Sequence, residues 1–242
     1  MIFTISARGK DPGMPVLVFL GSNYGYIPII NIDSIFGFVE RSKLYGGRPF
    51  LNPELTDNDV TDMYNVGIGL RIPFTNHYVE REEYEENIYL LEKYHRDGNA
   101  VIATNDDLAR WIREDFPLYR IEASVIKNLN THGKIDRALE LYDTVVIPMK
   151  LNQDLEFLKK IKEKDRITLF ANAGCALTCP SKICYSSISK MNKYEGAEFQ
   201  CSQSLKAREM LGMIDFDLEQ LEDIGFHRFK LLRARPGNVT GF

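Results

Sequence analysis

The centre of the chain, residues 100–171, reads AVIATNDDLARWIREDFPLYRIEASVIKNLNTHGKIDRALELYDTVVIPMKLNQDLEFLKKIKEKDRITLFA. Short apolar segments begin at residues 100, 119, 144 and 167, and the stretches between them place apolar residues at helical spacing. Such an alternation of strand and helix is typical of repeated βα units, which build a parallel sheet. This stretch therefore predicts a parallel α/β fold with short connections.

Towards both ends of the chain, four more segments have the composition of strands. The eight expected strands are Val16–Leu20, Ile35–Glu40, Val66–Ile72, Ala100–Thr104, Tyr119–Ser124, Thr144–Pro148, Ile167–Ala171 and Phe226–Leu231. Eight strands in 242 residues fit a TIM-like (β/α)8 barrel. Residues 21–34 and 41–64 hold little helical pattern, and no helix is expected after the last strand. We expect an incompletely decorated barrel that forms a single domain over residues 1–242, with an open doubly wound sheet as the alternative.

The composition and charge argue against several classes of protein. The chain holds 30 Lys and Arg against 34 Asp and Glu, and a net charge of −4 gives no general reason to bind nucleic acid. No apolar run approaches the roughly 20 residues that cross a bilayer, and no signal-peptide pattern opens the chain. We therefore expect a cytoplasmic protein without a membrane partner. No glycine-rich phosphate loop opens a helix, so the common nucleotide-binding folds lack their signature.

All four cysteines of the chain fall in one loop after the seventh expected strand. Cys175, Cys179, Cys184 and Cys201 have the spacing Cys-x3-Cys-x4-Cys-x16-Cys. In a parallel barrel, the loop after a strand lies on the face where active sites form. Clustered thiols in a reducing compartment are metal ligands more often than disulfides, and thiolates suit iron–sulfur clusters and zinc. The spacing favours a 4Fe-4S cluster in the cysteine loop 173–205, with zinc or unligated redox thiols as alternatives.

Three side chains near the expected strand ends are candidates for catalysis: Lys230, Glu122 and Asn172. Lys230 is a cation at the presumed catalytic face. Glu122 could transfer a proton, although a carboxylate in such a place more often pairs with arginine. Asn172 could orient a substrate beside the cysteine loop, or close a turn. The four histidines are scattered, and none is expected to form a nucleophilic pair with a serine or cysteine.

Candidates for substrate binding lie in the same loops. Arg233 and Arg235 follow the last expected strand, and their guanidinium groups could bind a carboxylate or phosphate. The alternative is that they end the strand in solvent with a structural ion pair. Asn76 follows the third expected strand and could bind substrate or close a turn.

The cysteine loop resembles that of a known family. Residues 171–185, ANAGCALTCPSKICY, are similar to the cysteine loop of the collagenase-like peptidases, family thirty-two among the peptidases of unknown catalytic type. Weaker matches lie in YGGRP at 45–49, at Asn76, in EASVI at 122–126 and in GFHRFKL at 225–231. The resemblance covers about residues 14–235, and the cysteine loop is its most specific part.

The resemblance implies a barrel with a 4Fe-4S cluster on four cysteines, and it adds Arg48 to the candidate substrate-binding residues. Family members act in oxygen-independent hydroxylation of ubiquinone precursors or RNA, and some are described as peptidases. The implied function is a hydroxylase-like redox enzyme, or its accessory subunit, acting on a small anionic or nucleic-acid substrate. The alternatives are a collagenase-like peptidase, or a non-catalytic protein with a structural metal or cluster that binds a partner protein.

The chain departs from the family pattern at three positions in this loop. Ala173 stands where the family has Glu, Lys182 where it has Arg, and Cys184 where it has His. The missing carboxylate removes a proton donor or acceptor beside the cluster. The reaction of the relatives therefore does not carry over to this chain by resemblance alone.

Overall fold

Eight parallel strands close into a barrel in the computed structural model, which describes residues 1–179, 181–204 and 213–233. Around the barrel the order is β1-β10-β7-β6-β5-β4-β3-β2, so that neighbours in space follow the order of the chain. The strands are β1 (Ile2–Ser6), β2 (Ile32–Phe36), β3 (Gly69–Ile72), β4 (Ala100–Ala103), β5 (Arg120–Ala123), β6 (Thr144–Val146), β7 (Ile167–Phe170) and β10 (Arg228–Leu231). Every pairing between them is parallel. The predicted (β/α)8 barrel is confirmed.

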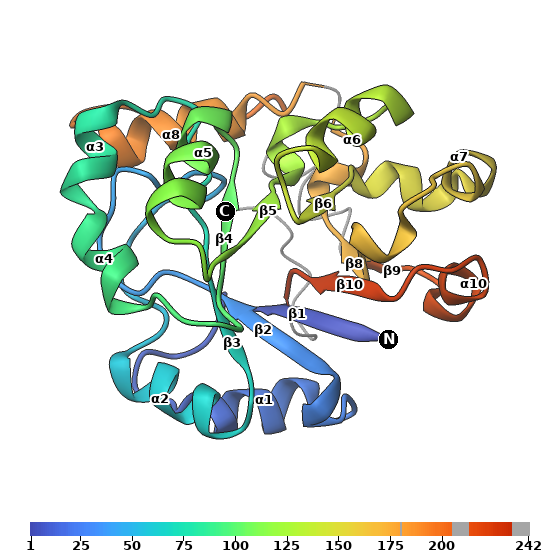
Figure 1. Ribbon diagram of the computed structural model, residues 1–242, viewed down its shortest axis with the longest axis horizontal. Coiled ribbons are helices and arrows are strands. Elements are labelled where there is room, and N and C mark those ends of the chain that lie inside the picture. The colour runs from blue at the N-terminus through green and yellow to red at the C-terminus, as the bar shows by residue number, and fades with distance from the viewer. Residues whose placement is uncertain (180, 205–212, 234–242) are drawn as a thin grey trace.

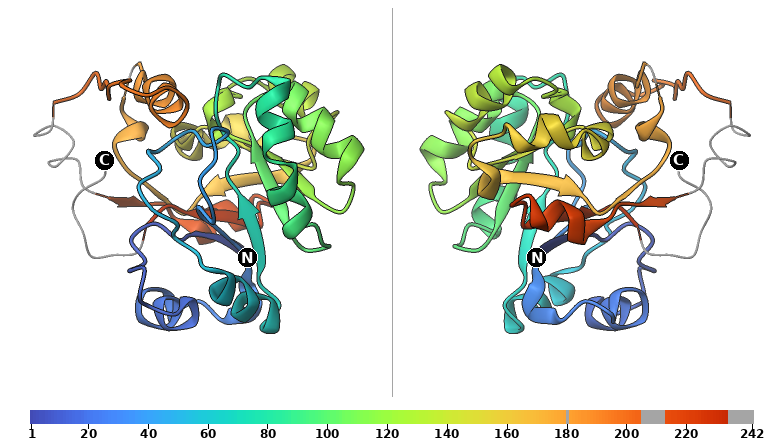
Figure 2. Two further views of the ribbon diagram at one scale, coloured as in Figure 1. Left: turned by 90° about the vertical axis from the view of Figure 1, so that its left-hand side faces the viewer. Right: turned by 90° about the vertical axis from the view of Figure 1, so that its right-hand side faces the viewer.

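Short helices cover the outside of the barrel, as Figure 1 and Figure 2 show. They are α1 (Val16–Tyr24), α2 (Asp57–Asn65), α3 (Arg81–Glu86), α4 (Ile88–Lys93), α5 (Asp106–Asp115), α6 (His132–Leu139), α7 (Leu155–Lys159), α8 (Cys184–Lys193) and α10 (Leu218–Asp223). Four of them, α3, α4, α7 and α10, have only five or six residues each. In the described part of the chain, no helix combines the length and apolar character needed to cross a membrane. The expectation of no helix after the last strand falls on residues 234–242, outside the described residues.

The first expected strand, Val16–Leu20, is wrong, because these residues form the start of α1. The side chains that α1 buries recur at helical spacing, and they are Val16, Phe19, Leu20 and Tyr24. The Val16 N–H donates to Asp59 Oδ1 at 2.8 Å, which satisfies one of the free amides at the helix start. A five-residue apolar run has the composition of a buried strand as well as of a buried helix. The first strand is instead Ile2–Ser6.

The other expected strands are correct in place and inexact in their bounds. The largest difference is at Ile35–Glu40, where β2 already ends at Phe36. Val66 to Ile68 precede β3 and form a turn, in which Gly67 has a φ of +80° that favours glycine. Boundaries of this kind depend on the pairing partner more than on local composition.

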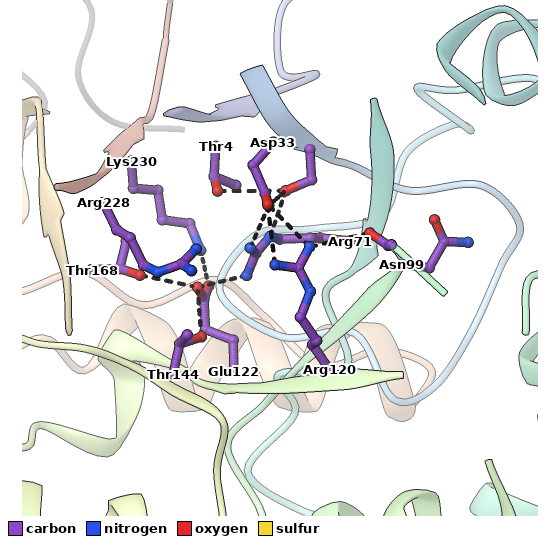
Figure 3. A network of polar contacts seen from close by, with 12 residues as sticks. Thr4, Asp33, Arg71, Asn99, Arg120, Glu122, Thr144, Thr168, Arg228 and Lys230 are labelled. Carbon is purple, nitrogen blue, oxygen red and sulfur yellow. Dashed lines mark hydrogen bonds and ion pairs between the residues drawn. The ribbon is translucent and has the colours of Figure 1, made fainter. Parts of the chain in front are cut away.

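The interior of the barrel contains a network of buried charges (Figure 3). Glu122 Oε2 lies 2.7 Å from Arg71 Nη1, and Glu122 Oε1 lies 2.8 Å from Lys230 Nζ. Arg71 also contacts Asp33 at 2.8 Å, and Asp33 in turn contacts Arg120 at 3.0 Å. The apolar core lies between the strands and the helices. Ion pairs therefore fill the centre of the barrel. Removal of any one partner would leave a buried unpaired charge, which is strongly unfavourable.

The carboxylates of this network stay ionised. Burial by itself raises the pKa of Glu122, but the charges of Lys230 and Arg71 lower it more, so the net pKa lies below the ordinary value. Burial likewise raises the pKa of Asp33, and Arg71 and Arg120 together bring it well below its usual range. Both groups are anions when the protein is folded at neutral pH.

Candidate functional site

A cavity of about 190 Å³ opens at the carboxyl ends of the barrel strands. Its floor is formed by residues at or near the ends of four strands: Ser6 of β1, Phe36 of β2, Phe170 of β7 and Lys230 of β10. This is the face of a parallel barrel on which active sites are built. The cavity is therefore the place where the sequence-predicted residues are expected to meet.

The four cysteines line this one cavity. Cys175 begins a short 3-10 turn after the strand β8 (Asn172–Ala173), which pairs with β9 (Ile214–Asp215). Cys184 is the first residue of α8, and Cys201 follows that helix. The chain thus turns back across the barrel mouth and brings all four thiols to the same space. The sequence predicted this convergence from the single loop that carries them.

The thiols are close enough to influence one another electrostatically. Burial raises the pKa of Cys184 to about 11, with added contributions from Cys201, Cys175 and Cys179. For Cys179 burial also raises the pKa, but hydrogen bonds from Ser202 and from backbone N–H groups outweigh it, and the pKa falls below the ordinary value. The Lys182 N–H donates to Cys179 Sγ at 3.3 Å. Ionisation is therefore easier at Cys179 than at Cys184.

The donor set suits a thiolate-bound metal centre in kind and number. The described lining contains four thiols and neither histidine nor carboxylate, which matches the ligands of a 4Fe-4S cluster and of an all-cysteine zinc site. Within the described ranges, however, no three His, Cys, Asp or Glu side chains are arranged to hold a metal ion. The sulfurs would therefore have to draw together around a bound centre.

Three arginines also line the cavity: Arg8, Arg48 and Arg233. Arg48 makes a bidentate ion pair with Glu54. Burial, together with the charges of Arg233 and Arg48, lowers the pKa of Arg8 to about 9. The arginines therefore repel one another, and a bound anion would relieve that repulsion. Arg8 was missed from the sequence because the strand before it was not assigned; a cation directly after β1 is the signal that could have found it.

Two of the three predicted catalytic residues, Glu122 and Lys230, form one buried ion pair across the barrel. Lys230 lines the cavity and lies 4.5 Å from the Phe36 ring centroid, whereas Glu122 lies beneath it, outside the lining. Burial lowers the pKa of Lys230, although Glu122 opposes the shift. The structure therefore places Lys230 where a ligand could contact it, and gives Glu122 the pairing role that the sequence left open.

Asn172 and Asn76, the two predicted asparagines, form hydrogen bonds to backbone groups. Asn172 Nδ2 donates to Arg233 O at 3.1 Å, and Asn172 Oδ1 accepts from the Leu232 N–H at 2.9 Å. Asn76 Nδ2 lies within hydrogen-bond distance of three carbonyl oxygens, those of Lys43, Tyr45 and Ser189. Neither residue lines the cavity. Arg235 lies outside the described residues.

One histidine contact was not expected from the sequence. His77 Nδ1 lies 3.0 Å from Ser189 Oγ, a geometry that resembles a nucleophile and its base. Ser189 is fully buried, and its hydroxyl also donates to Tyr185 O at 3.0 Å. A substrate has no access to that oxygen, so the pair fastens α8 to the loop after β3.

Comparisons with known proteins add the following. No family model matches the chain, and no curated protein matches it. Among solved structures, that of the U32 peptidase Mk0906 is similar, with a TM-score of 0.62 over 98% of this chain and 94% of that one. The two sequences are 14% identical. At that identity the likeness establishes the barrel fold.

Proposed function

We propose that the cavity is the ligand site of a U32-peptidase-like barrel protein, with a thiol wall and an arginine wall. The thiol wall is Cys175, Cys179, Cys184 and Cys201, and the arginine wall is Arg8, Arg48 and Arg233. The observation that carries the proposal is that both walls line one cavity at the carboxyl ends of the strands. Pockets with a few convergent polar groups in an apolar lining are the usual ligand sites of proteins.

The charge of the lining favours an anionic small molecule. In addition to the arginine wall, Lys182 and Lys230 line the cavity, and its described lining has no carboxylate. Behind the lining, Glu54 pairs with Arg48 and Glu122 pairs with Lys230. Guanidinium groups bind carboxylates and phosphates through paired hydrogen bonds. A substrate with an anionic group and an apolar body suits the site.

Sulfate, a simple dianion, tests the arginine wall. We expect the wild type to bind sulfate in calorimetric titration, and Arg8→Gln to weaken binding about tenfold, because one charge-assisted hydrogen bond is lost. Arg110→Gln is the matched control, since Arg110 is exposed on α5 and pairs with Asp107. Equal affinity of the wild type and Arg8→Gln would remove Arg8 from the proposed site.

Peptide hydrolysis is the activity that the structural comparison favours. Mk0906 is described as a U32 peptidase, and the similarity spans nearly all of both chains. The described lining has no histidine or carboxylate, so exchange of a proton with a scissile amide would fall to its lysines, Lys182 and Lys230, to its cysteines or to Tyr185. The structural comparison supports peptide hydrolysis more directly than it supports a redox function.

Oxygen-independent, hydroxylase-like redox chemistry is the second candidate, and it is favoured by the cysteines alone. A 4Fe-4S cluster held by the thiol wall would take up the electrons that oxidation of the substrate releases and pass them to an external electron acceptor. The arginine wall would hold the anionic group of the substrate, and Phe36, Met149 and Phe170 would limit access of water to it. If the cluster had only a structural role in the cysteine loop, the chain would be a non-catalytic binding protein. None of the comparisons bears on a cluster.

One experiment separates these candidates. The protein is purified without oxygen, and hydrolysis of a gelatin substrate is measured before and after iron is removed with a chelator. A peptidase should retain its activity after chelation. A redox enzyme should show no hydrolysis and should contain a centre that dithionite reduces, detected by paramagnetic resonance. Hydrolysis that disappears with iron would contradict both assignments as stated.

A further inference from the structure

Helix α8 connects the two walls of the cavity. Its first residue, Cys184, belongs to the thiol wall. Its later residues Ser189 and Asn192 are hydrogen-bonded to the loops after β3 and β2. Near its end, Lys193 Nζ lies 3.0 Å from Glu83 Oε2 and 3.2 Å from Glu80 Oε1. Figure 1 shows α8 beside α3, although the two helices are far apart in the sequence. The helix is therefore fixed at the end opposite to Cys184.

Asn192 of α8 makes three hydrogen bonds to the loop that carries Arg48. Its Oδ1 accepts from the Phe50 N–H at 2.8 Å. Its Nδ2 donates to Tyr45 O at 3.0 Å and to Arg48 O at 2.9 Å. The side chain spans residues 45–50 and uses its donor and acceptor groups on that loop alone. An amide that bonds three separate backbone groups fixes their relative positions.

The same loop is held from its other side by close packing. A Cβ on Gly46 would lie 2.3 Å from Thr75 O, so no larger residue fits there without displacement of the backbone. The Gly46 N–H also donates to Thr75 Oγ1 at 3.2 Å. The loop therefore lies between the segment after β3 and Asn192. Loss of Asn192 would free one of these two sides.

We propose that Asn192 is a positioning residue for Arg48 and thereby sets the distance between the thiol wall and the arginine wall. The inference rests on the proposed anion site. Glu54 holds the Arg48 guanidinium, and Asn192 holds the Arg48 backbone. An arginine fixed at both ends loses less conformational entropy when it binds an anion. Cys184 and Asn192 lie on one helix, so α8 links one thiol of the thiol wall to the backbone of Arg48.

Sulfate titration of four variants tests the role of Asn192. We expect Asn192→Ala to weaken sulfate binding about fivefold and Arg48→Gln to weaken it at least as much. The double variant should bind no more weakly than Arg48→Gln alone, because Asn192 acts through Arg48. Ser186→Ala, on the same helix, is the matched control and should bind as the wild type does. Its hydroxyl donates to Ile183 O, away from the loop.

Two results would overturn the inference. In the first, Asn192→Ala leaves sulfate affinity unchanged while Arg48→Gln lowers it. In the second, Asn192→Ala lowers affinity equally in both backgrounds, which would indicate a general structural defect. Thermal unfolding of each variant is followed by circular dichroism, and Asn192→Ser replaces Asn192→Ala if the latter is unfolded at the assay temperature. A wild type that binds no sulfate would contradict the proposed anion site itself, so the two failures are distinguishable.

Discussion

Replacement of Glu122 by alanine should lower the free energy of unfolding by about 3 to 5 kcal/mol, the range for a buried ion pair that loses one partner. Glu122 contacts both Arg71 and Lys230 inside the barrel, and all three side chains are buried. The variant would leave two cations without this counterion in the barrel interior. Urea denaturation at neutral pH measures the change.

An exposed pair serves as the control for this prediction. Glu156 contacts Lys159 on the surface of α7, and Glu156→Ala should leave the free energy of unfolding close to that of the wild type. The combination of Glu122→Ala with Lys230→Met should be less destabilising than the sum of the two changes, because each removes the same pair. A loss below about 1 kcal/mol for Glu122→Ala would show that water or another group compensates the cations.

The network also sets a dependence on pH. The pKa values of Asp33 and Glu122 are lowered in the folded protein, so their contribution is present above the unfolded values of about 4 and is lost as the pH falls below them. We expect the unfolding free energy to fall as pH decreases in this acid range. Glu122→Gln should reduce the slope. A slope equal to that of the wild type would contradict the ionised state of Glu122.

Replacement of Cys184 by serine should abolish binding of iron and sulfide. Cys184 interacts electrostatically with each of the other three thiols, so its replacement removes the one thiol that is known to lie near all of them. A serine hydroxyl is a poor substitute for the soft thiolate that such clusters require. Iron and acid-labile sulfide are measured after anaerobic reconstitution, and we expect both to fall to background.

The control for the cysteine variant is Ser186→Ala, which changes α8 without changing a thiol. It should bind iron and sulfide as the wild type does. Circular dichroism should show that Cys184→Ser keeps the barrel, because the main apolar core includes no residue of the cysteine loop 173–205. A complete cluster in Cys184→Ser would mean that Cys184 is not a ligand.

The order of the barrel strands could be predicted from the sequence where strand and helix alternate regularly. Residues 100–171 gave four strands in the correct places because each apolar segment there is bounded by a helix with a polar face. Near the N-terminus the apolar run at Val16 gave a strand where α1 lies. Its amide contact with Asp59, 43 residues away, has no local signature. Because strand β1 was not predicted, Arg8 was not recognised as a residue at a strand end.

In the candidate site, too, contacts within one loop could be predicted from the sequence, whereas contacts between distant segments could not. The convergence of the cysteines could be expected, since one loop carries them. The partners of Glu122 could not, because Arg71 and Lys230 are 51 and 108 residues away, and only closure of the barrel brings them together. Asn192 carries no motif, and its role follows from three contacts that depend on how α8 lies against the loop after β2.

The most direct test of the thiol wall is a measurement of iron and acid-labile sulfide in wild-type protein purified and reconstituted without oxygen. A 4Fe-4S cluster on the thiol wall predicts about four iron and four sulfide per chain. Protein that binds neither, while all four thiols react freely with a thiol reagent, would contradict it.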